Sequence, residues 1–160
     1  MNITDLSSIK VIDLDITTPI DVDQAVSGLG GEPAVFYGML GQYESMTLNQ
    51  SMKDIVDKYD NLDYAEFKNI AHSLKGSCGY VGAGKLHYAC YFIQENYVLN
   101  RTDKEMEFYP SLVEAAIEFK THSRMLIEKY NRKSNTSISY CLKLIKFNSM
   151  KNSNDYCLNI

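Results

Sequence analysis

Apolar residues recur at three- and four-residue steps along most of the chain, which is the spacing of one face of an α-helix. The pattern covers residues 34–59, with an expected break near Gly41 or Thr47, and residues 63–81, 83–99 and 110–130. Shorter helical patterns lie at residues 21–29 and 103–108. No stretch alternates apolar and polar residues over a strand's length. The sequence therefore predicts an all-α protein.

Residues that favour helix ends lie at the borders of these segments. Pro33 and Pro110 suit the first turn of a helix. Asp63 with Glu66, and Thr102 with Glu105, have the spacing of an N-cap residue and its capping-box partner. Gly82 suits the left-handed conformation that ends many helices.

The connections between the long helical segments are short, which favours antiparallel neighbours. We therefore expect an antiparallel up-and-down four-helix bundle with a short extra N-terminal helix. The expected organisation is an N-terminal arm at residues 1–18, the bundle at residues 19–131, and a flexible C-terminal tail at residues 132–160, where Asn, Ser and Lys predominate.

Composition narrows the possible partners. The 16 basic and 20 acidic residues give a net charge of −4, which does not favour nucleic acid or an anionic membrane surface. No apolar run is long enough to span a membrane, and no signal peptide is recognisable. We expect a cytoplasmic monomer, small enough to reach the nucleus. The four cysteines form no C-x-x-C pair, so we expect Cys78 and Cys90 to be reduced and packed inside helices.

One helical face of residues 63–81 gathers the chemically active side chains. At 100° per residue, the positions within about 60° of His72 are those of Lys68, Asn69, Lys75, Gly76 and Gly79, whereas the apolar positions lie opposite. His72 should therefore face solvent. Each helical glycine costs about 1 kcal/mol relative to alanine, which indicates that something else must approach this face closely.

The same face has the chemistry of an acceptor for an anionic group. An exposed imidazole is partly neutral and nucleophilic near pH 7. Lys75 lies one turn along, where its ammonium group can reach a group attached to the ring. The sequence has no phosphate-binding glycine loop and no acidic cluster spaced to hold Mg²⁺. We therefore expect no metal and no cofactor bound by this chain.

The stretch from Ala71 to Ala83, AHSLKGSCGYVGA, with Leu86 after it, resembles the signature of histidine phosphotransfer (HPt) domains. The resemblance covers roughly residues 20–130. It implies that His72 is the phosphoacceptor, that Lys75 and Gln94 stabilise the phosphoryl group, and that Gly76 admits the partner. We expect Gly79, Lys68 and Asn69, on the same helical face, to be further docking positions. The implied partners are receiver domains of hybrid sensor histidine kinases and of response regulators. These receiver domains would supply Mg²⁺. Some fungal members have a basic residue where Val98 stands here.

Two other functions remain open. The chain could be the phosphoacceptor fragment of a histidine kinase, although only about 30 residues follow Tyr130 for a nucleotide-binding domain. It could also be an adaptor that binds receivers without accepting phosphate.

His87 and His122 have no lysine and paired glycines beside them on the helix as His72 has, so we expect no direct role for either. Tyr88, Tyr91, Phe92 and Tyr97 are expected in the core and its rim.

Overall fold

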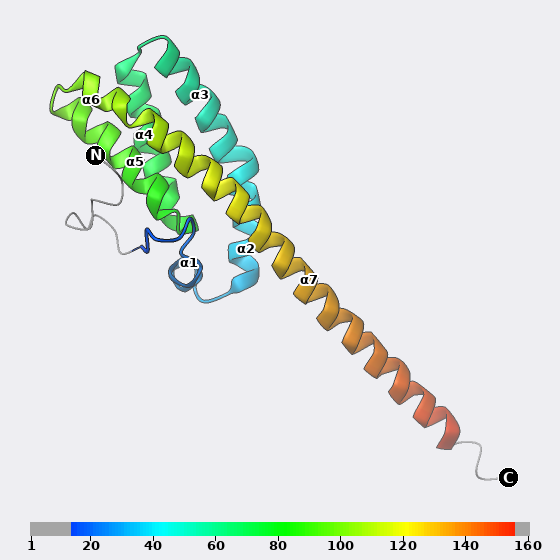
Figure 1. Ribbon diagram of the computed structural model, residues 1–160. Helices are drawn as coiled ribbons and strands as arrows, with labels where there is room; N and C mark the ends of the chain where they lie inside the picture. The colour runs from blue at the N-terminus through cyan, green and yellow to red at the C-terminus, as the bar shows by residue number, and fades with distance from the viewer. Residues whose placement is uncertain (1–13, 156–160) are drawn as a thin grey trace. The chain divides into compact units, whose positions relative to one another are not determined.

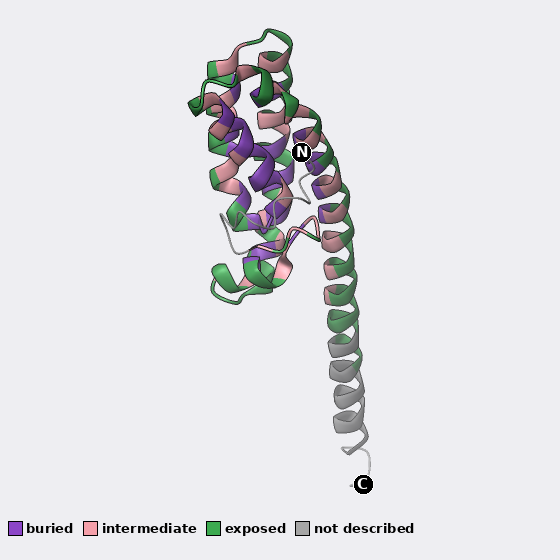
Figure 2. Ribbon diagram, turned by 60° about the vertical axis from the view of Figure 1, so that its left-hand side comes forward, coloured by how far each residue is buried: buried purple, intermediate pink, exposed green. Residues whose placement is uncertain are grey.

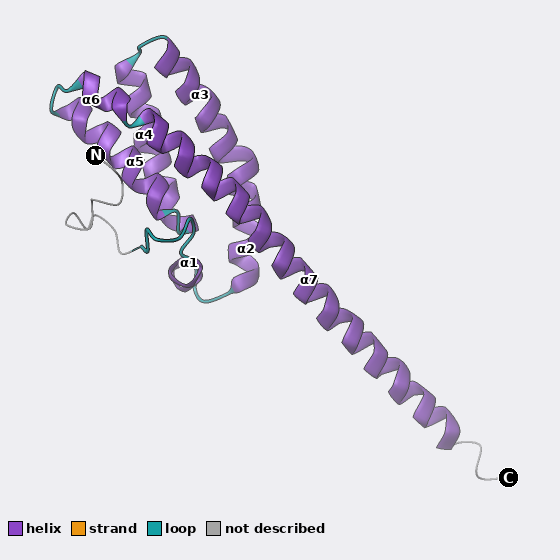
Figure 3. Ribbon diagram, in the orientation of Figure 1, coloured by secondary structure: helices purple, strands orange, loops and turns teal. Residues whose placement is uncertain are grey.

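The structure is a computed structural model that describes residues 14–155, and its regular elements are all helical (Figure 3). No strand occurs among these residues, so the predicted all-α class is confirmed. Residues 1–13 of the expected arm and residues 156–160 of the expected tail lie outside the described residues. The elements are α1 (Val22–Gly28), α2 (Pro33–Gln42), η2 (Tyr43–Leu48), α3 (Asn49–Asp60), α4 (Tyr64–Cys78), η3 (Gly79–Val81), α5 (Gly84–Val98), α6 (Thr102–Glu107) and α7 (Tyr109–Asp155).

The chain divides into two units, and the division falls within α7, between Met125 and Leu126. The helix predicted to end at Tyr130 continues to Asp155. The last proline of the chain is Pro110 and the last glycine is Gly84, so no strong helix breaker interrupts this segment. The boundary at residue 131 and the flexibility of residues 132–160 remain predictions.

The first unit is a helical bundle in which α4 packs against α3 and α5 (Figure 1). Contacts between side chains show that α4 and α5 run in opposite directions, as do α3 and the first part of α7. These contacts join Lys68 to Tyr97 and Lys75 to Gln94 between α4 and α5, and Tyr59 to Tyr109 and Asn49 to Lys120 between α3 and α7.

Large apolar side chains from all the long helices of the first unit fill its core. Figure 2 shows the buried residues of these helices in purple. Burial of each such side chain contributes roughly 1.5–3 kcal/mol to folding. The fully buried members include Phe36, Leu40, Leu48, Ile55, Phe67, Leu74, Leu86, Ile93, Leu112 and Phe119.

Asp63 caps the start of α4, and Gly82 caps η3, the short segment that follows α4. The Asp63 carboxylate accepts a hydrogen bond from the Glu66 backbone N–H at 3.2 Å, which confirms the predicted N-cap. At the other end Gly82 has φ +69°, and a Cβ there would lie 2.4 Å from the Asp21 carbonyl oxygen. The Asp21 N–H donates to the Gly82 carbonyl at 2.8 Å. Gly82 therefore allows α1 to pack closely at the C-terminal end of α4.

The predicted break in residues 34–59 is a π-helical segment, η2. Two consecutive residues, Tyr43 and Glu44, are both buried there. The Tyr43 hydroxyl lies 3.5 Å from the Cys78 sulfur, and the Glu44 carboxylate accepts a hydrogen bond from Arg124 at 2.8 Å. A π-helical turn is wider than an α-helical one. The wider turn of η2 lets two consecutive side chains, Tyr43 and Glu44, both point into the interior of the bundle.

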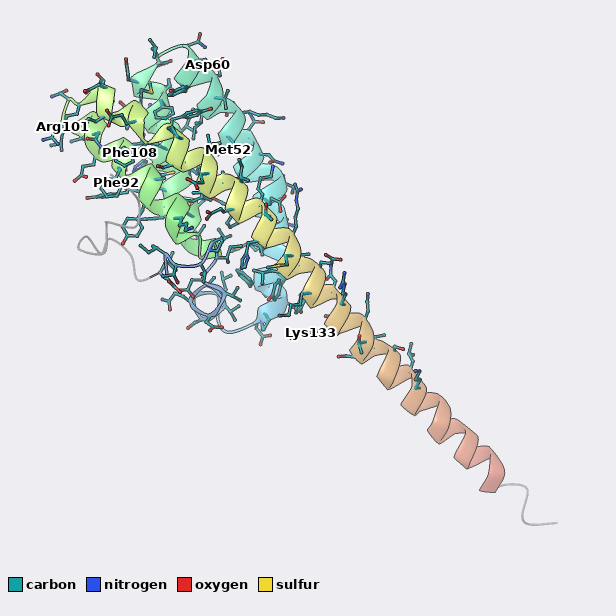
Figure 4. The ribbon with its side chains drawn as sticks, viewed as in Figure 1. Met52, Asp60, Phe92, Arg101, Phe108 and Lys133 are labelled. Atoms are coloured by element: carbon teal, nitrogen blue, oxygen red, sulfur yellow. The ribbon has the colours of Figure 1, made fainter. Side chains whose placement is uncertain are left out.

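The capping box predicted from Thr102 and Glu105 is wrong. Arg101 precedes α6 as its N-cap residue, makes no side-chain capping bond, and leaves Thr102 as the first helical residue. Glu105 instead turns inward and is 0% exposed, and neither carboxylate oxygen has a hydrogen-bond partner. Packing explains the orientation, because Phe108 at the end of α6 stacks on Phe92 of α5 at 5.3 Å (Figure 4).

Glu105 should make the stability of the bundle depend on pH. Burial raises the pKa of its carboxyl group from 4.5 to about 7, although the positive charge of Lys68 opposes the shift. Between about pH 4.5 and pH 7 the Glu105 carboxyl group is protonated in the folded protein but ionised in the unfolded chain. The free energy of unfolding should therefore fall as pH rises from about 4.5 to about 7.

We predict that Glu105→Gln flattens this decline and raises the free energy of unfolding at pH 8 by roughly 2 kcal/mol. Urea unfolding measured across the range tests it. Glu107→Gln, at an exposed position of the same helix, is the control. An equal decline with pH in Glu105→Gln and in the wild type would contradict the prediction.

Candidate functional site

His72 lies on the exposed face of α4, as the helical periodicity predicts. The opposite face of α4 buries Phe67, Ala71, Leu74 and Cys78 in the core. Because core packing fixes the rotation of the helix, it also fixes the direction in which His72 points. The imidazole is therefore presented to solvent by a rigid element.

The Gln94 side chain of α5 joins His72 to Lys75. Its amide oxygen, Oε1, lies 3.1 Å from His72 Nδ1 and accepts a hydrogen bond from Lys75 Nζ at 2.7 Å. An ammonium group can only donate, so the atom that faces Lys75 must be the amide oxygen rather than the amide nitrogen. The same oxygen can only accept from His72.

This arrangement determines which imidazole nitrogen is free to react. Since Gln94 Oε1 is an acceptor, His72 Nδ1 carries the proton. In the neutral ring the lone pair that is not part of the aromatic system then lies on Nε2. Whenever the ring is neutral, Nε2 is therefore its nucleophilic atom.

Lys75 is half-buried between α4 and α5. Its ammonium group lies 5.8 Å from the centre of the Tyr91 ring, within the range of a cation–π interaction. Its backbone carbonyl oxygen lies 3.2 Å from Nδ1 of His87. The Lys75 side chain and the Lys75 backbone are thus both held by residues of α5.

Two hollows flank the His72 face. The glycine hollow, about 350 Å³, lies between α1 and α4 and is lined by Gly28, Leu29, Gly76, Gly79 and Tyr80, among others. A Cβ added at Gly76 or Gly79 would meet nothing within 4 Å, so the fold itself does not require glycine at either position.

A second hollow, about 280 Å³, lies beside the ammonium group of Lys75. Tyr91, Gln94 and the exposed apolar side chains of Val98 and Leu99 help to line it. Val98 therefore adds an apolar surface rather than a second cation at the edge of the site.

Lys68 and Asn69 lie about one turn before His72 and interact with each other. Lys68 Nζ donates to Asn69 Oδ1 at 2.7 Å and lies 5.1 Å from the centre of the Tyr97 ring. The Asn69 amide donates to Glu66 at 3.0 Å. The structure thus groups His72, Lys75 and Gln94 through hydrogen bonds, with the Lys68–Asn69 pair at the rim.

Sequence reasoning gave His87 no part in this site and placed Tyr91 in the core and rim. Both contact Lys75. Their spacing is the signal that could have identified them, because Tyr91 lies three residues and His87 seven residues before Gln94. Those intervals place all three residues on one face of α5.

Among residues 14–155 no group of three or more His, Cys, Asp or Glu side chains is placed to hold a metal ion. Within the same residues, no helix has the length and apolar character needed to cross a bilayer.

Comparison with known proteins identifies the family. A family model described as "Hpt domain" matches residues 44–129, which is more than half of the 160-residue chain. Searches of curated proteins and of solved structures gave no significant match. The matched range contains α4 and α5 and therefore His72, Lys75 and Gln94. The chain belongs to the Hpt domain family.

Proposed function

We propose that this chain is a phosphocarrier that accepts a phosphoryl group on His72 from the aspartate of one receiver domain and passes it to the aspartate of a response regulator. Membership of the Hpt family supports a role in histidine phosphotransfer. The observation that supports His72 as the acceptor is the Gln94 oxygen shared by His72 Nδ1 and Lys75 Nζ. It places the proton of the neutral ring on Nδ1 and leaves the Nε2 lone pair on an exposed face.

The proposed step is a substitution at phosphorus. The lone pair of His72 Nε2 attacks the phosphorus of the aspartyl phosphate, the bond from phosphorus to the aspartyl oxygen breaks, and the carboxylate leaves with that electron pair. The ring then carries positive charge, which Gln94 Oε1 stabilises through the proton on Nδ1. Lys75 is close enough to turn from Gln94 toward the transferred phosphoryl oxygens.

The two helical glycines support docking of a receiver on this face. Gly76 and Gly79 are exposed, and the space above them is open. A partner can therefore approach the imidazole over bare backbone, with Lys68 and Asn69 at the rim of the contact. We propose that the receiver supplies the divalent cation, and that the chain acts as a monomer without ATP-dependent kinase activity.

Phosphoryl transfer from a receiver tests the proposed function. A receiver domain is phosphorylated with radiolabelled acetyl phosphate and Mg²⁺, freed of the small donor and mixed with this protein. We expect a label on the protein that is labile in acid and stable in alkali, as a phosphoramidate is. Labelled ATP alone should give none. No transfer from any of a panel of receivers would overturn the proposal, and labelling by ATP alone would indicate a kinase instead.

Lys75→Ala should slow transfer from the receiver about tenfold, because a cation about 4 Å from a phosphoryl group contributes on the order of 1–4 kcal/mol before screening. Single-turnover transfer measured at two ionic strengths checks this prediction. Lys53→Ala removes the same charge from an exposed position on α3 and is the control. Equal rates for the two variants would show that the ammonium group of Lys75 does not act on the phosphoryl group.

A further inference from the structure

Helix α5 contacts Lys75 at three points. Gln94 accepts from the ammonium group at 2.7 Å, and the Tyr91 ring lies 5.8 Å from it. The third contact is to the backbone, where His87 Nδ1 lies 3.2 Å from the Lys75 carbonyl oxygen. The proposed function uses the first contact and leaves the third unexplained.

The His87 contact has only one possible direction. A carbonyl oxygen cannot donate, so His87 Nδ1 carries the proton and donates it. His87 is a buried residue, only 7% exposed, and its Nε2 has no hydrogen-bond partner. Burial lowers the pKa of His87, the bond to the Lys75 carbonyl opposes this shift, and the positive charge of Lys75 adds to it, so the net pKa is lowered. His87 is therefore a neutral donor beneath the site.

The bond from His87 to the Lys75 carbonyl lies at the C-terminal end of α4, next to the two glycines. Lys75 lies in the last turn of α4, close to the point where the α-helix gives way to η3. The following residue is Gly76, and Gly79 begins η3. Neither glycine has a side chain to anchor this backbone against a neighbour. A donor from α5 therefore adds a direct tie between the Lys75 backbone and α5 to the core contacts that Leu74 and Cys78 make in the same turn.

We propose that His87 is a positioning residue, which holds the Lys75 backbone through its Nδ1–H so that the Lys75 ammonium group stays within reach of a phosphoryl group on His72. This inference rests on the proposed function for its effect on transfer. The contact itself does not depend on any partner.

Loss of the donor should slow phosphotransfer. A single hydrogen bond of this kind contributes about 1 kcal/mol, so we expect His87→Leu to reduce the single-turnover rate about fivefold. His87→Asn places an amide N–H close to the position of Nδ1 and should restore most of the rate. Phe92→Leu is the matched control, because Phe92 is buried on the same helix and packs on Phe108 rather than Lys75.

The experiment compares these variants under conditions where urea unfolding shows each to be fully folded. The proposal predicts that His87→Leu is slow and that His87→Asn and Phe92→Leu are close to the wild type. It is overturned if His87→Leu transfers as fast as Phe92→Leu, or if His87→Asn is as slow as His87→Leu. A wild-type protein that accepts no phosphoryl group would instead reject the proposed function.

A spectroscopic measurement separates the two failures, because it needs no receiver. In protein labelled with ¹⁵N-histidine, we expect the His87 ring to carry its proton on Nδ1, and the ¹³C resonance of the Lys75 carbonyl to shift in His87→Leu but not in Phe92→Leu. A proton on His87 Nε2, or an unchanged Lys75 carbonyl resonance, overturns the positioning role. Should His87→Leu fail to fold, the wild-type ring spectrum still decides the direction of the bond.

Discussion

His72→Gln should abolish phosphoryl acceptance and leave the bundle folded. Glutamine has no nucleophilic nitrogen, so the label transferred from a phosphorylated receiver should fall below detection. The side chain is exposed, and substitutions at such positions usually change the free energy of unfolding by no more than about 0.5 kcal/mol. Label transfer and urea unfolding of the same preparation measure both effects.

His122→Gln is the control for this prediction, since His122 lies on α7 and has no place in the proposed mechanism. It should accept the label at the wild-type rate. An acid-labile label that persists in His72→Gln would place the acceptor elsewhere. Undiminished receiver binding by His72→Gln, with no transfer to the wild-type protein, would favour a non-catalytic adaptor.

Gly76→Gln should raise the free energy of unfolding and lower the rate of phosphotransfer. A Cβ at this position meets nothing within 4 Å, and replacing glycine in a helix gains about 0.5–1 kcal/mol of stability. The added side chain would, however, project into the space through which a receiver approaches His72. A steric block at the centre of an interface costs about 3 kcal/mol, so transfer should fall roughly a hundredfold.

Gly38→Gln makes the same chemical change at an exposed helical position of α2, where a Cβ also meets nothing within 4 Å. It should gain similar stability and transfer at the wild-type rate. Thermal unfolding, receiver binding and single-turnover transfer of the two variants provide the comparison. Normal receiver binding and transfer by Gly76→Gln would show that the receiver does not dock over these glycines.

Most helices could be predicted from the sequence because local rules and tertiary packing agree there. The apolar period, the Asp63 cap and Gly82 together placed α4 within a few residues of its observed bounds. The local sequence rules gave wrong predictions where tertiary packing determines the orientation of a side chain. Glu105 has capping-box spacing, yet it is buried because Phe108 stacks on Phe92. The length of α7 was missed because polar composition was taken as a stop, although no proline or glycine interrupts the helix.

The site divides in the same way. His72 and Lys75 lie on one helix, so the helical period alone brings them together, and the resemblance to the HPt signature added Gln94. His87 contacts the Lys75 backbone through the packing of α5 on α4. A contact between two helices depends on their relative rotation and register, which one helix's periodicity does not supply. The direction of the Gln94 amide, and with it the reactive nitrogen of His72, likewise required the three side chains in space.

The position of phosphorus on the imidazole ring tests the central claim most directly. Protein labelled with ¹⁵N-histidine is phosphorylated by a receiver, and the ring nitrogen coupled to ³¹P is identified by NMR. The shared Gln94 oxygen predicts phosphorus on Nε2 of His72, with the Nδ1 proton retained. Phosphorus on Nδ1 of His72, or on any other residue, would contradict the account.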